Sequence, residues 1–290
     1  MIWRRTIWAA AIVTLNLISG CQDGRLLATP AQADQKPGRL VTLPQGRTIN
    51  LLCSGRGSPT VILEAGFGAD SAAWGKVQPK IARETRVCAY DRAGSGFSDP
   101  GPLPRDGAAI ARDLDMTLTE AGIEGPYVVV GHSAGGLYAR LFAARRPGEV
   151  QGLVLLDPTV EQRAPTPGRN DGLDGLRRRA QRCLATAQAT PQRTADDPAW
   201  TGCVGRNPSD RNWTVARRPE TWAGQVSELD SLFGRTSEQV FRLGELLSPL
   251  EQLAMIASAH LVLAQRGRLT FAGGQLAPEL RFELRFRLRR

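Results

Sequence analysis

The segment at residues 127–147 constrains the fold of this chain more than any other feature. Its sequence, YVVVGHSAGGLYARLFAARRP, joins an apolar run to a helix-like segment through a turn of small residues around Ser133. A strand that turns directly into a helix needs almost no side chain at the flanking positions, and Gly131 and Gly135 meet this need. The sequence therefore predicts that the hydroxyl of Ser133 is held clear above the end of a strand.

Similar apolar runs occur before and after this segment. They lie at residues 39–43, 48–53, 60–66, 85–91 and 150–157, and turns that contain Gly or Pro separate them. Helix-like segments occupy residues 105–121, before Gly122, and residues 135–146, before Pro147. Nearly continuous apolar strands that alternate with helices are typical of a sheet covered on both faces. We therefore expect an α/β fold with a mainly parallel, doubly wound sheet.

The chain divides into a core, a cap and an atypical C-terminal part. Residues 39–160 carry the strand-and-helix pattern of the predicted core. Residues 161–228 lack strand-like runs, which favours a cap or lid inserted over the carboxyl edge of the sheet. Residues 229–290 are assigned to the core, although residues 244–267 are helix-like and the tail alternates apolar and charged residues. Because the pattern changes near Gln239, a shifted reading frame or a truncated gene is a further hypothesis for this part.

The N-terminus has the features of an export signal. Arg4 and Arg5 precede an apolar run at residues 7–18, which is too short to span a hydrocarbon core of about 30 Å as a helix. The run ends in ISGC, which resembles the bacterial lipobox, in which the cysteine, here Cys21, is lipidated and becomes the first residue. An ordinary leader and a twin-arginine leader are the alternatives.

The region around Cys21 defines the expected location of the protein. We expect residues 1–20 to be a lipoprotein signal peptide and residues 21–38, which have little apolar content, to be a flexible tether. The protein would then be exported and held by a lipid anchor on the periplasmic or cell-surface side of a bacterial membrane.

The other cysteines favour disulfides. They are even in number, as expected for disulfides in an exported protein, and comprise Cys53, Cys88, Cys183 and Cys203. Cys53 and Cys88 lie in two predicted strands, whereas Cys183 and Cys203 bracket a loop-rich part of the cap. We therefore predict the pairs Cys53–Cys88 and Cys183–Cys203. A zinc site is the alternative, but the chain has no CxxC spacing and only two histidines, so no metal is expected.

The positive charge of the chain does not by itself indicate a nucleic-acid partner. The formal net charge is +9, but no recognition motif or aromatic and basic stripe is present. Several arginines crowd into the last ten residues, namely Arg281, Arg285, Arg287, Arg289 and Arg290. Such excess charge commonly sets solubility and non-specific adhesion, so no nucleic acid is expected as a partner.

Four ordered motifs carry a resemblance to a known family. They are LEAGFG at 63–68, YDRAGSGFSDPGP at 90–102, VVVGHSAGGLYARLFAARRP at 128–147 and VQGLVLLDP at 150–158. Together they resemble the α/β-hydrolase superfamily, and most of all its bacterial esterase- and peptidase-like branch, over residues 39–157. The resemblance implies an α/β-hydrolase fold with an eight-stranded sheet and an inserted cap, hydrolysis through a covalent serine intermediate, and no cofactor.

The resemblance also implies roles for individual residues. Cys53 and Cys88 should lie on neighbouring strands, in agreement with the predicted disulfide. Asp91 and Arg92 should organise the loop after the fourth strand rather than react. Trp74 is expected to be a packing residue rather than a substrate contact.

The predicted chemistry centres on Ser133 as nucleophile. Glycines around Phe67 leave backbone amides free, so the N–H groups of Phe67 and Ala134 are the predicted oxyanion hole. A serine hydroxyl becomes nucleophilic when a histidine takes its proton. His132 adjoins the nucleophile, where its side chain should point away from the hydroxyl, and the family does not use that position. His260 is therefore the candidate base.

The carboxylate that would orient His260 is predicted to be Asp157, at the end of the strand-like run at 150–157. A loop-shaping role is an equal alternative for Asp157. The family places the acid after a later strand, but the segment before His260 has a helix-like pattern and offers only Glu245 and Glu251.

These residues favour an exported serine hydrolase that cleaves a small-molecule carboxylic ester through an acyl-enzyme at Ser133. Amides or small peptides are further candidate substrates, because the same site handles both. A dehalogenase is disfavoured, since it needs a carboxylate in place of Ser133. The alternative from a different class is a catalytically inactive hydrolase-fold lipoprotein with a binding or structural role.

Overall fold

The computed structural model describes most of the predicted core and cap. The described residues are 37–161, 172–189, 194–205, 208, 210–246, 255–257, 260–264 and 268–272, and beyond residue 243 only the backbone is considered. The predicted signal peptide, the proposed lipidation site Cys21 and the tether up to residue 36 lie outside these residues. Among the described helices, none is both long and apolar enough to cross a membrane.

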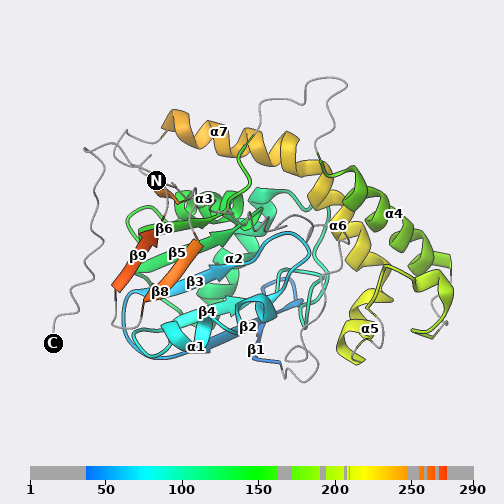
Figure 1. Cartoon of the computed structure of the whole chain (residues 1–290), viewed down its shortest axis with the longest axis horizontal. Coiled ribbons are helices and arrows are strands. Elements are labelled where there is room, and N and C mark those ends of the chain that lie inside the picture. The colour runs from blue at the N-terminus through cyan, green and yellow to red at the C-terminus, as the bar shows by residue number, and fades with distance from the viewer. Residues whose placement is uncertain are drawn as a thin grey trace, which may run out of the picture.

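One mixed sheet organises the core (Figure 1). Its strands are β1 (Arg39–Thr42), β2 (Thr48–Ser54), β3 (Thr60–Glu64), β4 (Val87–Tyr90), β5 (Tyr127–His132), β6 (Val150–Leu156) and β7 (Met255–Ala257). The strand order is β1-β2-β4-β3-β5-β6-β7. β2 is antiparallel to β1 and β4, whereas β4, β3, β5, β6 and β7 pair in parallel. The prediction of a mainly parallel α/β sheet is confirmed.

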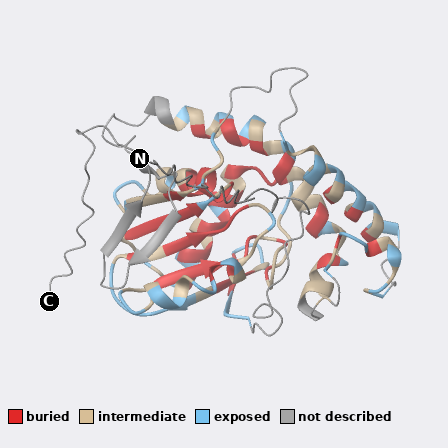
Figure 2. Cartoon of the chain, in the orientation of Figure 1, coloured by how far each residue is buried: buried red, intermediate tan, exposed pale blue. Residues whose placement is uncertain are grey.

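Helices cover both faces of this sheet. On one side lie α2 (Gly107–Ala121), which ends at Gly122 in the left-handed conformation, and α3 (Gly135–Arg145). On the other lie the short α1 (Gln78–Ile81) and the 3-10 turn η2 (Ser71–Trp74). Successive strand residues point to opposite faces, so Ile62 packs with the α2 and α3 side and Leu63 with the other side. The buried residues follow the strands and the inner faces of the helices (Figure 2).

Trp74 is 5% exposed and packs with Leu63 in the apolar cluster on the α1 side of the sheet, which confirms that it is a packing residue.

The described part of the cap is mainly helical. It contains α4 (Asp174–Ala189), the 3-10 turn η3 (Pro198–Trp200), α5 (Asp210–Ala216) and α6 (Pro219–Ser231), after which the π-helical turn η4 (Leu232–Thr236) leads into α7 (Ser237–Leu246). The expected end of the cap at residue 228 therefore falls inside α6. The cap has its own apolar cluster, which includes Trp200 and Trp222.

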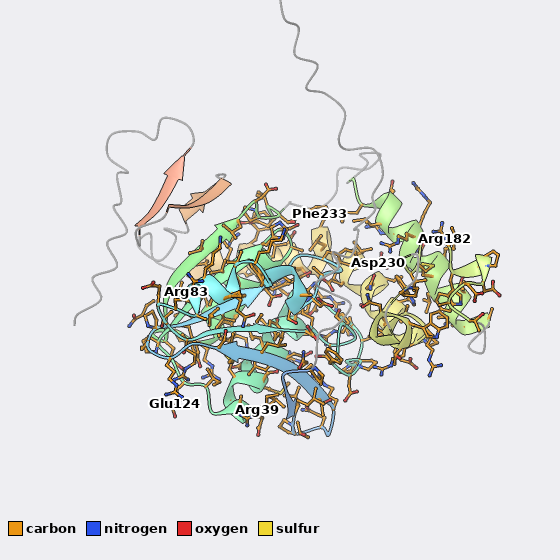
Figure 3. All side chains as sticks on the ribbon, turned by 60° about the horizontal axis from the view of Figure 1, so that its bottom comes forward. Arg39, Arg83, Glu124, Arg182, Asp230 and Phe233 are labelled. Carbon is orange, nitrogen blue, oxygen red and sulfur yellow. A yellow bond between two sulfur atoms is a disulfide. The ribbon has the colours of Figure 1, made fainter. Side chains whose placement is uncertain are left out.

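Figure 3 shows how the two parts are arranged: Arg182 lies on the cap, Arg39, Arg83 and Glu124 lie around the core, and Asp230 and Phe233 lie between them. Phe233 packs against the core cluster directly after the end of α6.

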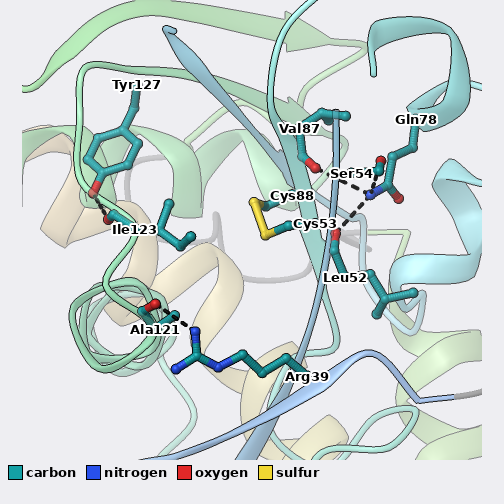
Figure 4. Close-up of a disulfide and its surroundings, with 10 residues drawn as sticks. All are labelled: Arg39, Leu52, Cys53, Ser54, Gln78, Val87, Cys88, Ala121, Ile123 and Tyr127. Carbon is teal, nitrogen blue, oxygen red and sulfur yellow. Dashed lines mark hydrogen bonds between the residues drawn. A yellow bond between two sulfur atoms is a disulfide. The ribbon is translucent and has the colours of Figure 1, made fainter. Parts of the chain in front are cut away.

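Both predicted disulfides are present. Cys53 and Cys88 face each other in the register of the antiparallel strands β2 and β4, with their Cα atoms 4.0 Å apart. The close-up in Figure 4 shows this bridge, with Gln78 donating a hydrogen bond to the Leu52 carbonyl beside it. Cys183 and Cys203 join α4 to the turn after η3, with a Cα–Cα distance of 5.6 Å.

The prediction of a helix over residues 244–267 holds for 244–246 and is wrong for the described residues 255–257 and 260–264. α7 ends at Leu246, Met255–Ala257 forms β7 beside β6, and β8 (His260–Ala264) pairs with β9 (Arg268–Ala272) in a separate antiparallel sheet. Short apolar runs of this kind suit a helix or a strand equally by periodicity, and pairing with a neighbour decides between them. The main sheet has seven strands in the described part of the chain, so the implied eighth strand is not found there.

Candidate active site

Ser133 occupies a strained turn between β5 and α3. Its φ angle is 52°, in the left-handed region that non-glycine residues rarely adopt. Hydrogen bonds hold the turn in place: the Ser133 N–H donates to the Leu156 carbonyl at 3.1 Å, and the Ser133 carbonyl accepts from the N–H groups of Gly136 and Thr159, both at 2.9 Å. The turn is thus tied both to α3 and to the loop after β6, and the serine is partly exposed.

The two glycines of the turn are required by close backbone contacts. A Cβ on Gly131 would lie 2.6 Å from the Gly135 carbonyl oxygen, and a Cβ on Gly135 would lie 2.5 Å from the Glu64 carbonyl oxygen. No real side chain fits at such distances. β5, α3 and the end of β3 therefore approach each other closely only because Gly131 and Gly135 lack side chains.

The loop after β3 lies against Ser133. A Cβ built on Gly66 would be 3.2 Å from the Ser133 Cβ. Among the described residues, neither the Phe67 N–H nor the Ala134 N–H has a hydrogen-bond acceptor. Ala134 is also the N-cap of α3, where the helix dipole favours negative charge. Two free donors beside a serine are the elements of an oxyanion hole.

Ser133 and Asp157 lie at the same edge of the sheet. Ser133 follows the end of β5 and Asp157 the end of β6, and the carboxyl ends of parallel strands share an edge. Asp157 is exposed, with a φ of 42°. His132 is exposed beside Gly66, and within the described residues no side chain is hydrogen-bonded to the Ser133 hydroxyl.

The backbone of His260 begins β8, and its imidazole lies outside the described side chains. His260 is the third residue after Ala257, the end of β7, so their Cα atoms are at most about 11 Å apart. β7 is parallel to β6 and ends opposite Leu156. The chain therefore leaves the sheet toward His260 at the edge that holds Ser133 and Asp157.

Comparisons with known proteins agree with this architecture. A family model for the alpha/beta hydrolase fold matches residues 59–190. The fold is shared with an epoxide hydrolase, CorEH (TM-score 0.51, 17% identity, 69% of this chain and 76% of that one), and with a putative ancestral haloalkane dehalogenase, AncHLD2 (TM-score 0.52, 22% identity, 71% and 76%). The chain has the α/β-hydrolase fold.

Curated relatives match the chain over shorter stretches. An uncharacterized protein of Schizosaccharomyces pombe is 42% identical over 28% of this chain and 15% of its own length. The uncharacterized protein YqjL of Bacillus subtilis is 33% identical over 37% and 42%. The putative carbamate hydrolase RutD of Klebsiella pneumoniae is 35% identical over 35% and 38%. The chain thus spans less than half the length of these relatives.

A buried cluster of charged and phenolic groups lies beside the loop after β3, which carries Phe67. Its members come from β3, β4, the loop after β4, α3 and α6, and they are Glu64, Tyr90, Arg92, Tyr138 and Glu228. Arg92 Nη1 donates to Glu64 Oε1 at 2.9 Å, and Arg92 Nη2 donates to Glu228 Oε1 at 3.2 Å. Tyr90 donates a hydrogen bond to Glu64, and Tyr138 donates to Glu228 Oε1 at 2.9 Å. Two carboxylates thus share one guanidinium.

The cluster perturbs Glu64 in particular. Burial raises the pKa of Glu64 to about 7, against the opposing charge of Arg92 and the hydrogen bond from Tyr90. Burial also raises the pKa of Tyr90 and of Tyr138. A proton on Glu64 near neutral pH leaves one carboxylate for one guanidinium, which removes the excess buried charge.

The Glu64→Gln variant is expected to remove a pH dependence of stability. The ordinary pKa of about 4.5 rises to about 7 in the folded state, so between these values the native state keeps a proton that the unfolded chain has released. The contribution of Glu64 to the free energy of unfolding therefore falls by about 3 kcal/mol as the pH rises from about 4.5 to 7. Glutamine does not titrate. Urea unfolding across this pH range should show that the difference in the free energy of unfolding between parent and variant changes by about 3 kcal/mol.

The matched control is Glu120→Gln, an exposed glutamate on α2. If the difference in the free energy of unfolding between the parent and Glu64→Gln stays constant across this pH range, Glu64 does not hold the assigned proton.

In the described part of the chain, no three His, Cys, Asp or Glu side chains are grouped as a metal site.

Proposed function

We propose that this protein is a serine hydrolase that cleaves carboxylic esters, or amides by the same route, through an acyl-enzyme at Ser133. The observation that carries the proposal is the strained turn at Ser133, with a φ of 52° and two free backbone N–H groups beside it. Such a turn costs free energy and persists because the surrounding hydrogen bonds enforce it. Its effect is to present a hydroxyl to a bound carbonyl group.

In the proposed reaction, Ser133 Oγ bonds to the carbonyl carbon of the ester while its proton passes to His260. The carbonyl oxygen gains the negative charge and accepts hydrogen bonds from the N–H groups of Phe67 and Ala134. Collapse of the tetrahedral intermediate breaks the bond to the alcohol, which takes the proton from His260. Water repeats the two steps on the acyl-enzyme and frees the acid. Asp157 orients the imidazole.

The sheet edge supports His260 and Asp157 as partners of the nucleophile. The ends of β5, β6 and β7 are adjacent, and neighbouring strands are about 4.8 Å apart, so the three chain segments leave the sheet within about 10 Å of each other. RutD, a relative described as a putative carbamate hydrolase, provides parallel support because carbamates, like esters and amides, are cleaved at a carbonyl carbon.

The proposal includes export and a lipid anchor on Cys21. Two disulfides support export, since they persist in oxidising compartments. The intact mass of the protein extracted from membranes tests the anchor: a chain that begins at an unmodified residue other than Cys21 excludes it.

Labelling with a fluorophosphonate tests the nucleophile. An activated serine displaces fluoride and gains the phosphonyl group, so the intact mass of the purified protein should increase by one adduct, and peptide mapping should place it on Ser133. Ser133→Ala is the control, with circular dichroism to show that both proteins are folded. A folded parent that stays unlabelled refutes the proposal and favours the inactive, binding or structural hydrolase.

A further inference from the structure

Arg92 holds the backbone of the oxyanion loop, by which we mean residues 65–68 after β3. Arg92 is 4% exposed, and its guanidinium donates to the Ala65 carbonyl through Nη1 at 2.6 Å and to the Gly66 carbonyl through Nη2 at 2.7 Å. Both carbonyl groups belong to the loop that carries Phe67. A charged donor makes a shorter and stronger hydrogen bond than a neutral one, so these contacts fix the loop firmly.

The contact with Gly66 helps to fix the direction of the Phe67 N–H, together with the Ala69 N–H, which donates to the same carbonyl at 3.2 Å. The Gly66 carbonyl and the Phe67 N–H belong to one peptide unit, which is planar and is not among the cis bonds of the described chain. In a trans unit the two groups point in opposite directions. Arg92 therefore pulls the carbonyl to one side of the loop, and the N–H points to the other, away from the guanidinium.

The cap supplies a residue that holds Arg92. Glu228, on α6, contacts the same nitrogen, Nη2, that donates to the Gly66 carbonyl. Tyr138, on the helix that begins at the nucleophile turn, donates to the same oxygen of Glu228, and its ring lies 5.4 Å from the Arg92 guanidinium carbon. Glu228 thus links the cap to α3 through Tyr138 and to the oxyanion loop through Arg92.

We infer that Glu228 is a positioning residue: it fixes Arg92, and through the Gly66 carbonyl it aims the Phe67 N–H at the developing oxyanion. The inference rests on the proposed function for its effect on the rate. Glu64 cannot replace Glu228 in this task, because Glu64 contacts Nη1 and Tyr90 and leaves Nη2 to Glu228.

The experiment compares Glu228→Gln with Glu220→Gln, which makes the same chemical change at an exposed position of α6. Outright loss of an oxyanion donor costs about 10²–10³ in rate, so a loosened donor in Glu228→Gln should lower kcat about tenfold and leave KM unchanged, because it acts only in the transition state. Arg92→Lys, which loses the planar fork, should lower kcat by about 10²–10³. Glu220→Gln should behave as the parent.

A second experiment, NMR spectroscopy of the Phe67 amide, does not depend on activity. The chain has 8 phenylalanines, so selective ¹⁵N-phenylalanine labelling gives few amide signals, and Phe67→Leu assigns the one of interest. In Glu228→Gln the Phe67 amide signal should shift or broaden, whereas Glu220→Gln should leave it in place.

The outcomes separate the two proposals. An unmoved Phe67 signal in Glu228→Gln overturns the positioning role, with or without a change in rate. A moved signal with an unchanged kcat in an active parent overturns it as well. A parent that hydrolyses no ester and takes no fluorophosphonate refutes the proposed function, and the amide signal then decides the positioning role alone.

Discussion

Ser133→Ala is expected to lower kcat for a small ester by about 10⁶-fold. The alanine variant keeps the turn, the oxyanion donors and the substrate site, but it cannot form the acyl-enzyme. Loss of the nucleophile in a serine protease costs about that factor, and the oxyanion hole and binding account for the activity that remains. Initial rates with an activated aryl ester, at equal folded concentrations, measure the effect.

The variant should be as stable as the parent. In the described part of the chain the Ser133 side chain makes no hydrogen bond, and alanine meets the same backbone strain as serine at a φ of 52°. Thermal unfolding provides the control. A well-folded Ser133→Ala protein that keeps the parental kcat places the chemistry on another residue and rules out the proposed nucleophile.

The core could be predicted from sequence because its local signals agree with each other. The apolar runs that became β1 to β6 are bounded by Gly and Pro, and α2 ends at Gly122 as its sequence indicates. The disulfide Cys53–Cys88 follows from the same agreement, since both cysteines lie in predicted strands that prove to be neighbours.

The C-terminal part could not be predicted because its signals are short and local. β7 has three residues, Met255–Ala257, and becomes a strand by pairing with β6 rather than through its own pattern. The cap sequence has many helix breakers, yet α4 and α6 form because their apolar residues pack on each other around the Cys183–Cys203 bridge. The formation of β7 and of the cap helices therefore depends on tertiary contacts, which local sequence patterns do not indicate.

The charged cluster was missed for a similar reason. Arg92 was expected to organise a loop, and it does hold the backbone at Ala65 and Gly66. Its partner Glu228 lies 136 positions away, at the predicted end of the cap. A glutamate on a surface-like helix carries no local sign of burial, so only the folded chain reveals the contact.

His260→Ala is expected to lower kcat as severely as Ser133→Ala, by about 10⁶-fold. Without a base, the Ser133 hydroxyl stays protonated and cannot attack. Residues that act as one unit are not additive, so the double variant should be no slower than either single variant. An equal kcat for the double variant and each single variant, measured with the same aryl ester, shows that the two residues act in one step. The loss in either single variant does not show this by itself.

His132→Asn is the control, since it removes the other histidine of the chain while leaving the proposed base. It should keep most of the parental kcat. If His260→Ala keeps its activity while His132→Asn loses it, the proton is taken at the nucleophile turn and the strand that leads to His260 has no catalytic role. If both variants are active, no histidine is the base, and a carboxylate at the same sheet edge, Asp157 above all, becomes the group to replace next.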